Sequence, residues 1–348
     1  LEPLGRLDVL DEVGERALQY FAAVPEESLS EAELSRRAKA LRQIGEVRVS
    51  QGQLGEAMPA FERALGLSQR LVDQQPDRTE WLKGLGDSRY WIGFVFYRQG
   101  RWEDALRQFE EYQATARKLV EIEPDEPEWR LELSYAHGNI ASVLQAQGRI
   151  EQALVPLEAN VALRRELAAA RPQDQHLQLD LARAHNKVGA VLHQLGRSSE
   201  ALVHHLAELR LKQGLVALAP DNTRWVLELA LAHNYCGDVR DDTGMLPEAL
   251  DHFESAVLLM RRLVETEPDN VDWRWELAVN QVRLASLERR RGNTARAREL
   301  QQGALRAFEE LVELNPDDPL WQRDLAYAYS EGALLAPGTG VQSARSDG

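Results

Sequence analysis

Three histidines have a spacing that suggests metal chemistry. His137, His185 and His233 follow one another at intervals of 48 residues. Imidazole nitrogen is a common metal ligand, and a bound zinc ion needs its ligands at about 2 Å. In a helical array with this period, neighbouring copies would lie roughly 10 Å apart, which is too far to share one ion. The spacing therefore favours packing roles for these histidines, and we predict no metal site.

The other reactive side chains form no catalytic motif. The sequence has no Gly-rich phosphate loop, no HExxH, no paired Cys and no Ser/His/Asp arrangement that can be placed together. The single Cys236 lies on an apolar stripe and is expected to be buried and inert. The densest acidic set is Asp238, Asp241 and Asp242; it opposes the dipole of a helix end, which favours a basic partner group from another molecule or from the same chain. We predict no catalytic residue, no cofactor and no enzymatic activity.

The strongest pattern in the chain is a repeat of 48 residues. Pro, Gly and Trp each recur at this interval, which indicates one structural unit copied about six times. Such an array grows by addition and need not split into the two or three domains that 348 residues would otherwise suggest. The marker residues are Pro76, Pro124, Pro172, Pro220, Pro268 and Pro316; Gly52, Gly100, Gly148, Gly196, Gly244 and Gly292; and Trp81, Trp129, Trp225, Trp273 and Trp321, with Leu177 in the one gap.

Each unit reads as a pair of helices. In residues 77–124, Asp77 is a suitable N-cap, Gly100 suits the left-handed position after the first helix, and Pro124 stops the second. The Trp lies in the first turn of each first helix, where it can pack on the end of the preceding second helix. We therefore expect Trp225→Ala or Trp273→Ala to cost roughly 3–5 kcal/mol of stability. The equivalent N-caps are Asp125, Asp221, Asp269 and Asp317.

Small and aromatic residues inside each hairpin follow fixed offsets. Gly93, Phe96, Ala105 and Phe109 stand at offsets 0, 3, 12 and 16, and the first, fourth and fifth units follow the same pattern from Gly45, Gly189 and Gly237. This pattern resembles the tetratricopeptide repeat (TPR) over about residues 29–336, with Ala141 and Ala285 replacing the small glycine in the third and sixth units. The period exceeds the family's usual 34 residues by about two helical turns per helix. Such long repeats resemble those of bacterial multidomain proteins, where the array is joined to an effector domain.

The resemblance implies an all-α fold. We expect a right-handed superhelical solenoid of antiparallel helical hairpins, with about six full repeats plus capping helices. An N-terminal capping helix is expected within residues 1–28, the solenoid over 29–336 and a disordered tail at 337–348. The expected repeats are 29–76, 77–124, 125–172, 173–220, 221–268 and 269–316, with a half-repeat at 317–336.

The charge and hydropathy of the chain restrict its partners. The formal net charge of −15 argues against a nucleic-acid backbone or an anionic membrane as the main partner, because both attract cationic surfaces. The sequence has no uninterrupted apolar span of about 20 residues, so no transmembrane helix is predicted. We expect a cytoplasmic location and leave the oligomeric state open.

TPR arrays commonly bind peptides along a concave face lined by first helices. By resemblance, the groove positions lie 6 and 3 residues before the small residue and 1, 4 and 5 after it. An aromatic patch at these positions either binds a partner or packs against the first unit or the N-terminal helix. Further along, three acidic residues face two arginines and either bind a partner or form an ion-pair cluster. The predicted partner-binding residues are Tyr90, Phe94, Tyr97, Tyr135, Asn186, Asn234, Asp238, Asp241, Asp242, Arg289 and Arg290.

Two functional hypotheses follow. The first is a non-enzymatic protein–protein interaction scaffold that holds a peptide or a partner helix in its groove. The second is a regulatory or sensory arm of a larger bacterial signalling or defence protein, which contacts its own effector domain or associates with itself. The start at Leu1 and the long-repeat style motivate the second.

Overall fold

The structure is a computed structural model that describes residues 14, 16, 25 and 28–335. Every regular element in the described residues is helical, which confirms the all-α class. The capping helix predicted within residues 1–28 falls almost wholly outside the described residues, and the tail 337–348 lies outside them. The chain divides into two compact units, Leu1–Gln173 and Asp174–Gly348, which are described separately below.

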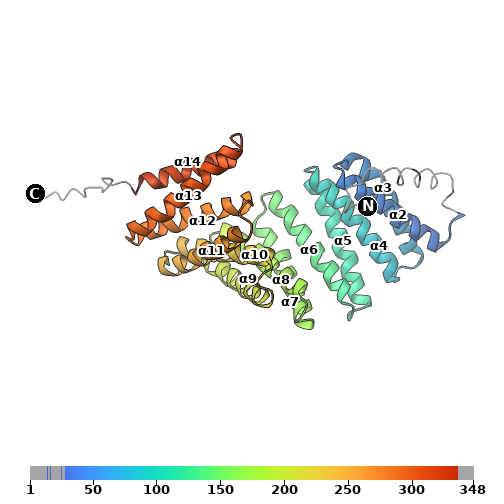
Figure 1. Cartoon of the computed structure of the whole chain (residues 1–348). Helices are drawn as coiled ribbons and strands as arrows, with labels where there is room; N and C mark the ends of the chain where they lie inside the picture. The colour runs from blue at the N-terminus through green and yellow to red at the C-terminus, as the bar shows by residue number, and fades with distance from the viewer. Residues whose placement is uncertain (1–13, 15, 17–24, 26–27, 336–348) are drawn as a thin grey trace, which may run out of the picture. The chain divides into compact units, whose positions relative to one another are not determined.

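Unit 1 is a stack of helical hairpins in which each helix packs on the next along the chain (Figure 1). The short 3-10 helix η3 (Glu151–Ala153) precedes the last helix, so the second helix of the third hairpin begins with a 3-10 turn. The helices are α2 (Glu31–Ser50), α3 (Leu54–Gln74), α4 (Thr79–Arg98), α5 (Trp102–Ile122), α6 (Pro127–Ala146) and α7 (Leu154–Ala170).

Unit 2 has the same construction and ends in a single helix. Its first helices also contact one another across the repeat, α8 with α10 and α12 with α14. The helices are α8 (Gln175–Gln194), α9 (Ser198–Leu218), α10 (Thr223–Asp242), α11 (Leu246–Thr266), α12 (Val271–Arg290), α13 (Thr294–Leu314) and α14 (Pro319–Ala333).

The glycine of each hairpin bend has the backbone conformation that the sequence predicts. All six residues of the glycine ladder have positive φ, from 73° to 91°. This left-handed region is strained for residues with a Cβ atom and open to glycine. The glycine ladder therefore marks the end of every first helix in both units.

The predicted N-caps are one residue too early. Asp221 lies in the turn after Pro220, and the side chain of the next residue, Asn222, accepts a hydrogen bond from the Trp225 amide at 3.2 Å. Asn270 and Asp318 cap α12 and α14 in the same way. Proline and the residue after it form the turn, so the extended capping conformation falls on the third residue.

Close approach of the paired helices depends on what faces the small residue. A Cβ atom added at Gly93 would lie 2.8 Å from the Phe109 ring, and one at Gly237 would lie 2.7 Å from Phe253. In the third unit the small residue is Ala141, and the equivalent of Phe109 is Leu157 rather than an aromatic ring. Glycine therefore stands where a ring packs on the facing helix, and alanine is accommodated where none does.

The tryptophan ladder joins successive repeats, most deeply in unit 1. Trp81 is 3% exposed and belongs to a core cluster with Leu67 and Leu71 of the preceding second helix. Trp129 is 7% exposed and donates a hydrogen bond from its indole nitrogen to Glu123 at 2.7 Å. Trp273 packs near Met260 and Leu263 in unit 2 but is only half-buried. These contacts confirm the predicted packing on the preceding second helix.

The histidines of the 48-residue series lie between neighbouring first and second helices. His137 contacts Gln113, with 3.0 Å between the side-chain nitrogens. His185 pairs with His204, and His233 with His252, each with 3.1 Å between the two Nδ1 atoms. Within the described residues, no group of three or more His, Cys, Asp or Glu side chains is arranged to hold a metal ion.

Candidate partner-binding site

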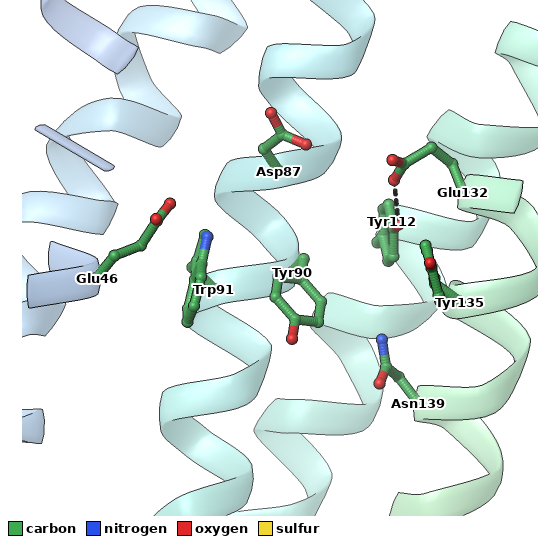
Figure 2. Close-up of a pocket in the computed structure, with 8 residues that line it drawn as sticks. All are labelled: Glu46, Asp87, Tyr90, Trp91, Tyr112, Glu132, Tyr135 and Asn139. Carbon is green, nitrogen blue, oxygen red and sulfur yellow. Dashed lines mark hydrogen bonds between the residues drawn. The ribbon is translucent and has the colours of Figure 1, made fainter. Parts of the chain in front are cut away.

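A pocket of about 410 Å³ opens on the first-helix face of unit 1. Its volume is within the usual range for sites that take a small ligand or a side chain. The lining residues come from α2, α4, α5 and α6, so three successive repeats build it. They are Glu46, Asp87, Tyr90, Trp91, Tyr112, Glu132, Tyr135 and Asn139. Figure 2 shows Glu46 on one side of the Tyr90 and Trp91 rings and Glu132 and Tyr135 on the other.

Aromatic rings hold one another in place across this pocket. Tyr90 lies edge-on to Trp91 and to Tyr112, with centroid separations of 5.2 and 6.1 Å. Trp91 also stacks on Phe61 of α3, with 5.5 Å between ring centroids. Edge-to-face and offset stacking at these distances is favourable beyond simple burial. The rings therefore form a pre-organised wall, and only Tyr135, at 41% exposed, projects well into solvent.

The carboxylates of the pocket are oriented by groups on its flanks. Asp87 lies 3.5 Å from Arg42 of α2, and Glu132 lies 3.2 Å from Lys83 of α4. The Tyr112 hydroxyl donates a short hydrogen bond to Glu132, drawn dashed in Figure 2. These contacts link neighbouring first helices, so the same ion pairs that join the repeats also fix the acidic side chains at the pocket.

Burial and charge shift the proton affinities of these groups. Burial raises the pKa of Asp87, against the opposing charges of Lys83 and Arg42. Burial raises the pKa of Tyr90, and the charges of Glu46 and Glu132 raise it further. Burial lowers the pKa of Lys83, but its hydrogen bond to Glu128 and the nearby carboxylates outweigh burial and raise it overall. Lys83 therefore remains protonated and keeps its carboxylate partners in place at neutral pH.

Only two of the four residues of the predicted aromatic patch line the pocket. Tyr90 and Tyr135 line the pocket. Phe94 and Tyr97 are half-buried on the same helix as Tyr90 but are not among the lining residues. Phe94 packs against Trp91, with 5.6 Å between ring centroids. Two residues of the patch thus line the pocket, whereas Phe94 packs against a ring of its own helix, and partner binding by the patch stays a prediction.

The predicted acidic set in unit 2 contacts basic groups of the same unit. Asp238 accepts two 3.0 Å hydrogen bonds from Arg283, and Asp241 pairs with Arg290. Asp242 lies 2.6 Å from the His193 ring. Arg289 does not join this set, because it pairs instead with Glu331 of α14 at 3.7 Å. The three carboxylates therefore hold α10 to α8 and α12.

The two predicted asparagines also have internal surroundings. Asn186 donates a 3.0 Å hydrogen bond to Glu208 of α9. Asn234 is 7% exposed, and its side-chain oxygen has no hydrogen-bond partner within the described residues. Cys236, two residues further along α10, is fully buried, and burial raises the pKa of its thiol to about 12. This bears out the expectation of an inert thiol.

Unit 2 fills the place equivalent to the pocket with an ion-pair network. Two repeats after Tyr90, Tyr112 and Glu132, the equivalent positions hold Asn186, Glu208 and Glu228, in that order. The Lys212 ammonium lies 2.6 Å from the fully buried Glu208 and 2.9 Å from Glu228. Arg183, at the position of Asp87, lies 2.5 Å from Glu228. Charged groups thus satisfy one another there, whereas unit 1 presents rings around a cavity.

Sequence reasoning missed half of the lining. It gave no binding role to Trp91, Tyr112, Glu132 or Asn139. One signal could have found Glu132, because an acidic residue recurs at its repeat position in every later unit. The series is Glu132, Asp180, Glu228, Glu276 and Asp324.

Comparisons with known proteins agree with the repeat pattern. Three models described as tetratricopeptide repeat match residues 38–70, 87–122 and 282–320. The second match contains four of the lining residues, Asp87, Tyr90, Trp91 and Tyr112. No curated protein sequence matches the chain. In the described residues, no helix is long and apolar enough to cross a membrane.

Solved structures with similar folds include three from different sources. BtubC from P. vanneervenii is 17% identical, with a TM-score of 0.54 over 74% of this chain and 92% of its own. The S. pombe nuclear import adaptor Nro1 is 12% identical, with a TM-score of 0.58 over 86% and 99%. The C-terminal part of a TPR repeat-containing protein from Cytophaga hutchinsonii is 12% identical, with a TM-score of 0.52 over 92% and 98%. At these identities the likeness concerns the fold alone.

Proposed function

Because this chain is a tetratricopeptide repeat protein, we propose that it is an interaction scaffold whose partner polypeptide binds on the first-helix face of unit 1. TPR repeats generally mediate protein binding and are generally non-enzymatic. The binding site is the pocket lined by Tyr90, Trp91 and Tyr135, with the extended partner lying across α4 and α6.

One observation carries this assignment: the pocket combines a preformed ring wall with an exposed aromatic side chain. Tyr and Trp are the residues that most often dominate binding energy at protein interfaces, because they bury large areas at low entropic cost. Tyr90 and Trp91 are held by neighbouring rings, and Tyr135 is 41% exposed at the mouth. The groove positions of unit 2 are instead engaged in ion pairs, for example between Asp238 and Arg283.

The proposal is tested by selecting a displayed library of random 12-residue peptides on the full chain. The same selection is run on Tyr135→Ala and on Tyr327→Ala. Tyr327 stands at the repeat position of Tyr135, four repeats later on α14, and is 56% exposed. It is therefore a matched loss of an exposed tyrosine outside the pocket. Tyr135 is preferred to Tyr90 for this test, because Tyr90 also packs against Phe109 and its loss would disturb the fold.

We expect peptides enriched on the wild type to be retained on Tyr327→Ala and lost on Tyr135→Ala. Truncating a central aromatic residue of an interface commonly costs 2 kcal/mol or more, about thirtyfold in affinity. Equal enrichment on both variants would contradict the site. Circular dichroism spectra and melting temperatures of the two variants control for changes in folding.

A further inference from the structure

We propose that the unit 1 pocket holds a cationic side chain, Lys or Arg, of the bound partner. This inference rests on the proposed function, since it specifies the chemistry of the partner at the same site. It goes beyond binding in a groove, because the scaffold alone implies no particular side chain at this place.

The first argument is the charge of the lining. Glu46, Asp87 and Glu132 supply three carboxylates, and no Lys, Arg or His is among the lining residues. Two basic groups contact these carboxylates, Arg42 at Asp87 and Lys83 at Glu132, and both line a neighbouring pocket of about 240 Å³ instead. Lys83 also pairs with Glu128 at 2.9 Å, and Arg164 lies over the Tyr135 ring. Four carboxylates against three cations leave the surroundings with one net negative charge. An acidic side chain here would be repelled, and an apolar one would cover the carboxylates without compensating them.

The second argument is the presence of rings beside the carboxylates. A cation near the face of Tyr or Trp is attracted by the ring quadrupole, and the attraction increases when water is excluded. The chain itself places arginines in this way: Arg164 lies 5.2 Å from the centre of the Tyr135 ring, and Arg101 lies 4.2 Å from that of Phe96. In the pocket, Tyr90 and Trp91 stand between Glu46 and Glu132, as Figure 2 shows. A partner cation there would meet rings and carboxylates together.

The third argument is the charge of the whole chain. A formal net charge of −15 favours basic partners by long-range attraction, which raises the rate of encounter. The contrast with unit 2 is informative, because there Lys212 contacts both Glu208 and Glu228, and Arg183 contacts Glu228. The chain's own cations thus fill the equivalent place in unit 2. In unit 1 a partner's cation takes that role.

The inference is tested on the peptides selected above, so that its failure can be told apart from failure of the site itself. Each Lys or Arg of a selected peptide is replaced in turn by norleucine, which keeps the aliphatic chain and removes the charge. Dissociation constants are measured by fluorescence anisotropy. On the protein side, Glu132→Gln removes one pocket charge and keeps an acceptor for the Tyr112 hydroxyl. Its matched control is Glu228→Gln, two repeats later and outside the pocket.

We expect at least one norleucine replacement to weaken binding about tenfold or more, and Glu132→Gln to weaken it more than Glu228→Gln. Binding should also weaken as salt rises from about 50 to about 500 mM. Tyr135-dependent peptides that tolerate every norleucine replacement would overturn this inference and leave the proposed site standing. Absence of any Tyr135-dependent peptide would overturn both. The peptide replacements do not depend on how well a protein variant folds.

Discussion

At the scale of single residues, the fold depends on matching each small residue to the side chain that faces it. Gly45, Gly93, Gly189 and Gly237 each face an aromatic ring at less than 3 Å from where a Cβ would stand. Protein interiors are close-packed, so a methyl group added at one of these glycines must displace the ring or the helix. The alanines at the same repeat position face non-aromatic side chains. The spacing alone predicted the small residue, but the choice between Gly and Ala depends on its neighbour.

We therefore predict that Gly93→Ala destabilises the protein by about 1–3 kcal/mol, because the new methyl group meets Phe109. Adding Phe109→Leu should recover part of the loss, since Ala141 and Leu157 already form this combination one repeat later. Gly66→Ala is the control: nothing lies within 4 Å of its added Cβ, so helix propensity should make it neutral or stabilising. Thermal unfolding followed by circular dichroism measures all three. No recovery in the double variant would count against a clash with the ring.

The histidine pairs predict a pH dependence of stability. Burial, together with the charge of His252, lowers the pKa of His233 to about 4, and burial lowers that of His252. Unfolding restores values near 6.5, so between about pH 6.5 and 4 the unfolded state binds more protons. Stability should therefore be full above pH 6.5 and fall as the pH decreases towards 4.

His233→Gln tests this account directly, because Gln281 already occupies the same position one repeat later. Between pH 7.5 and pH 5, we expect the melting temperature of the variant to fall by a few degrees less than that of the wild type. Identical pH profiles for the two proteins would show that the pair does not supply the dependence.

At the scale of helices, the sequence predicts ends better than starts. The six bend glycines and the prolines after each second helix place the helix ends correctly, because each residue has a strong backbone preference. The N-caps fall one residue later than expected, at Asn222, Asn270 and Asp318 among others. Several polar residues in a row can all serve as caps, and only the geometry of the proline turn decides between them.

The tryptophan ladder should contribute unequally to stability. Trp129 is almost fully buried and hydrogen-bonded to Glu123, whereas Trp225 is half-buried. We expect Trp129→Ala to cost roughly 3–5 kcal/mol and Trp225→Ala clearly less, because the cost follows the buried area lost. The sequence-based expectation for Trp225 assumed full burial. Melting curves of the two variants measure the difference, and a larger loss for Trp225→Ala would contradict this ranking.

At the scale of the whole molecule, the two units place different kinds of side chains at equivalent positions of the same repeat. Unit 2 places ion pairs at its groove positions and a buried network between its helices, and unit 1 places rings around a cavity. The sequence predicted the groove face and two of the pocket's rings, Tyr90 and Tyr135, from family offsets. It could not predict the cavity, because that depends on side chains from three repeats meeting in space. Glu132 joins the site for the same reason, whereas Glu46 stands at a family groove position, one residue after Gly45.

The most direct test of the central claim is one ratio of dissociation constants, measured for a selected peptide on Tyr135→Ala and on Tyr327→Ala. Both variants remove an exposed tyrosine at the same repeat position, and only Tyr135 lines the pocket. We predict that Tyr135→Ala binds the peptide at least tenfold more weakly than Tyr327→Ala, a difference of about 1.4 kcal/mol. Equal dissociation constants for the two variants would contradict a partner-binding site in unit 1.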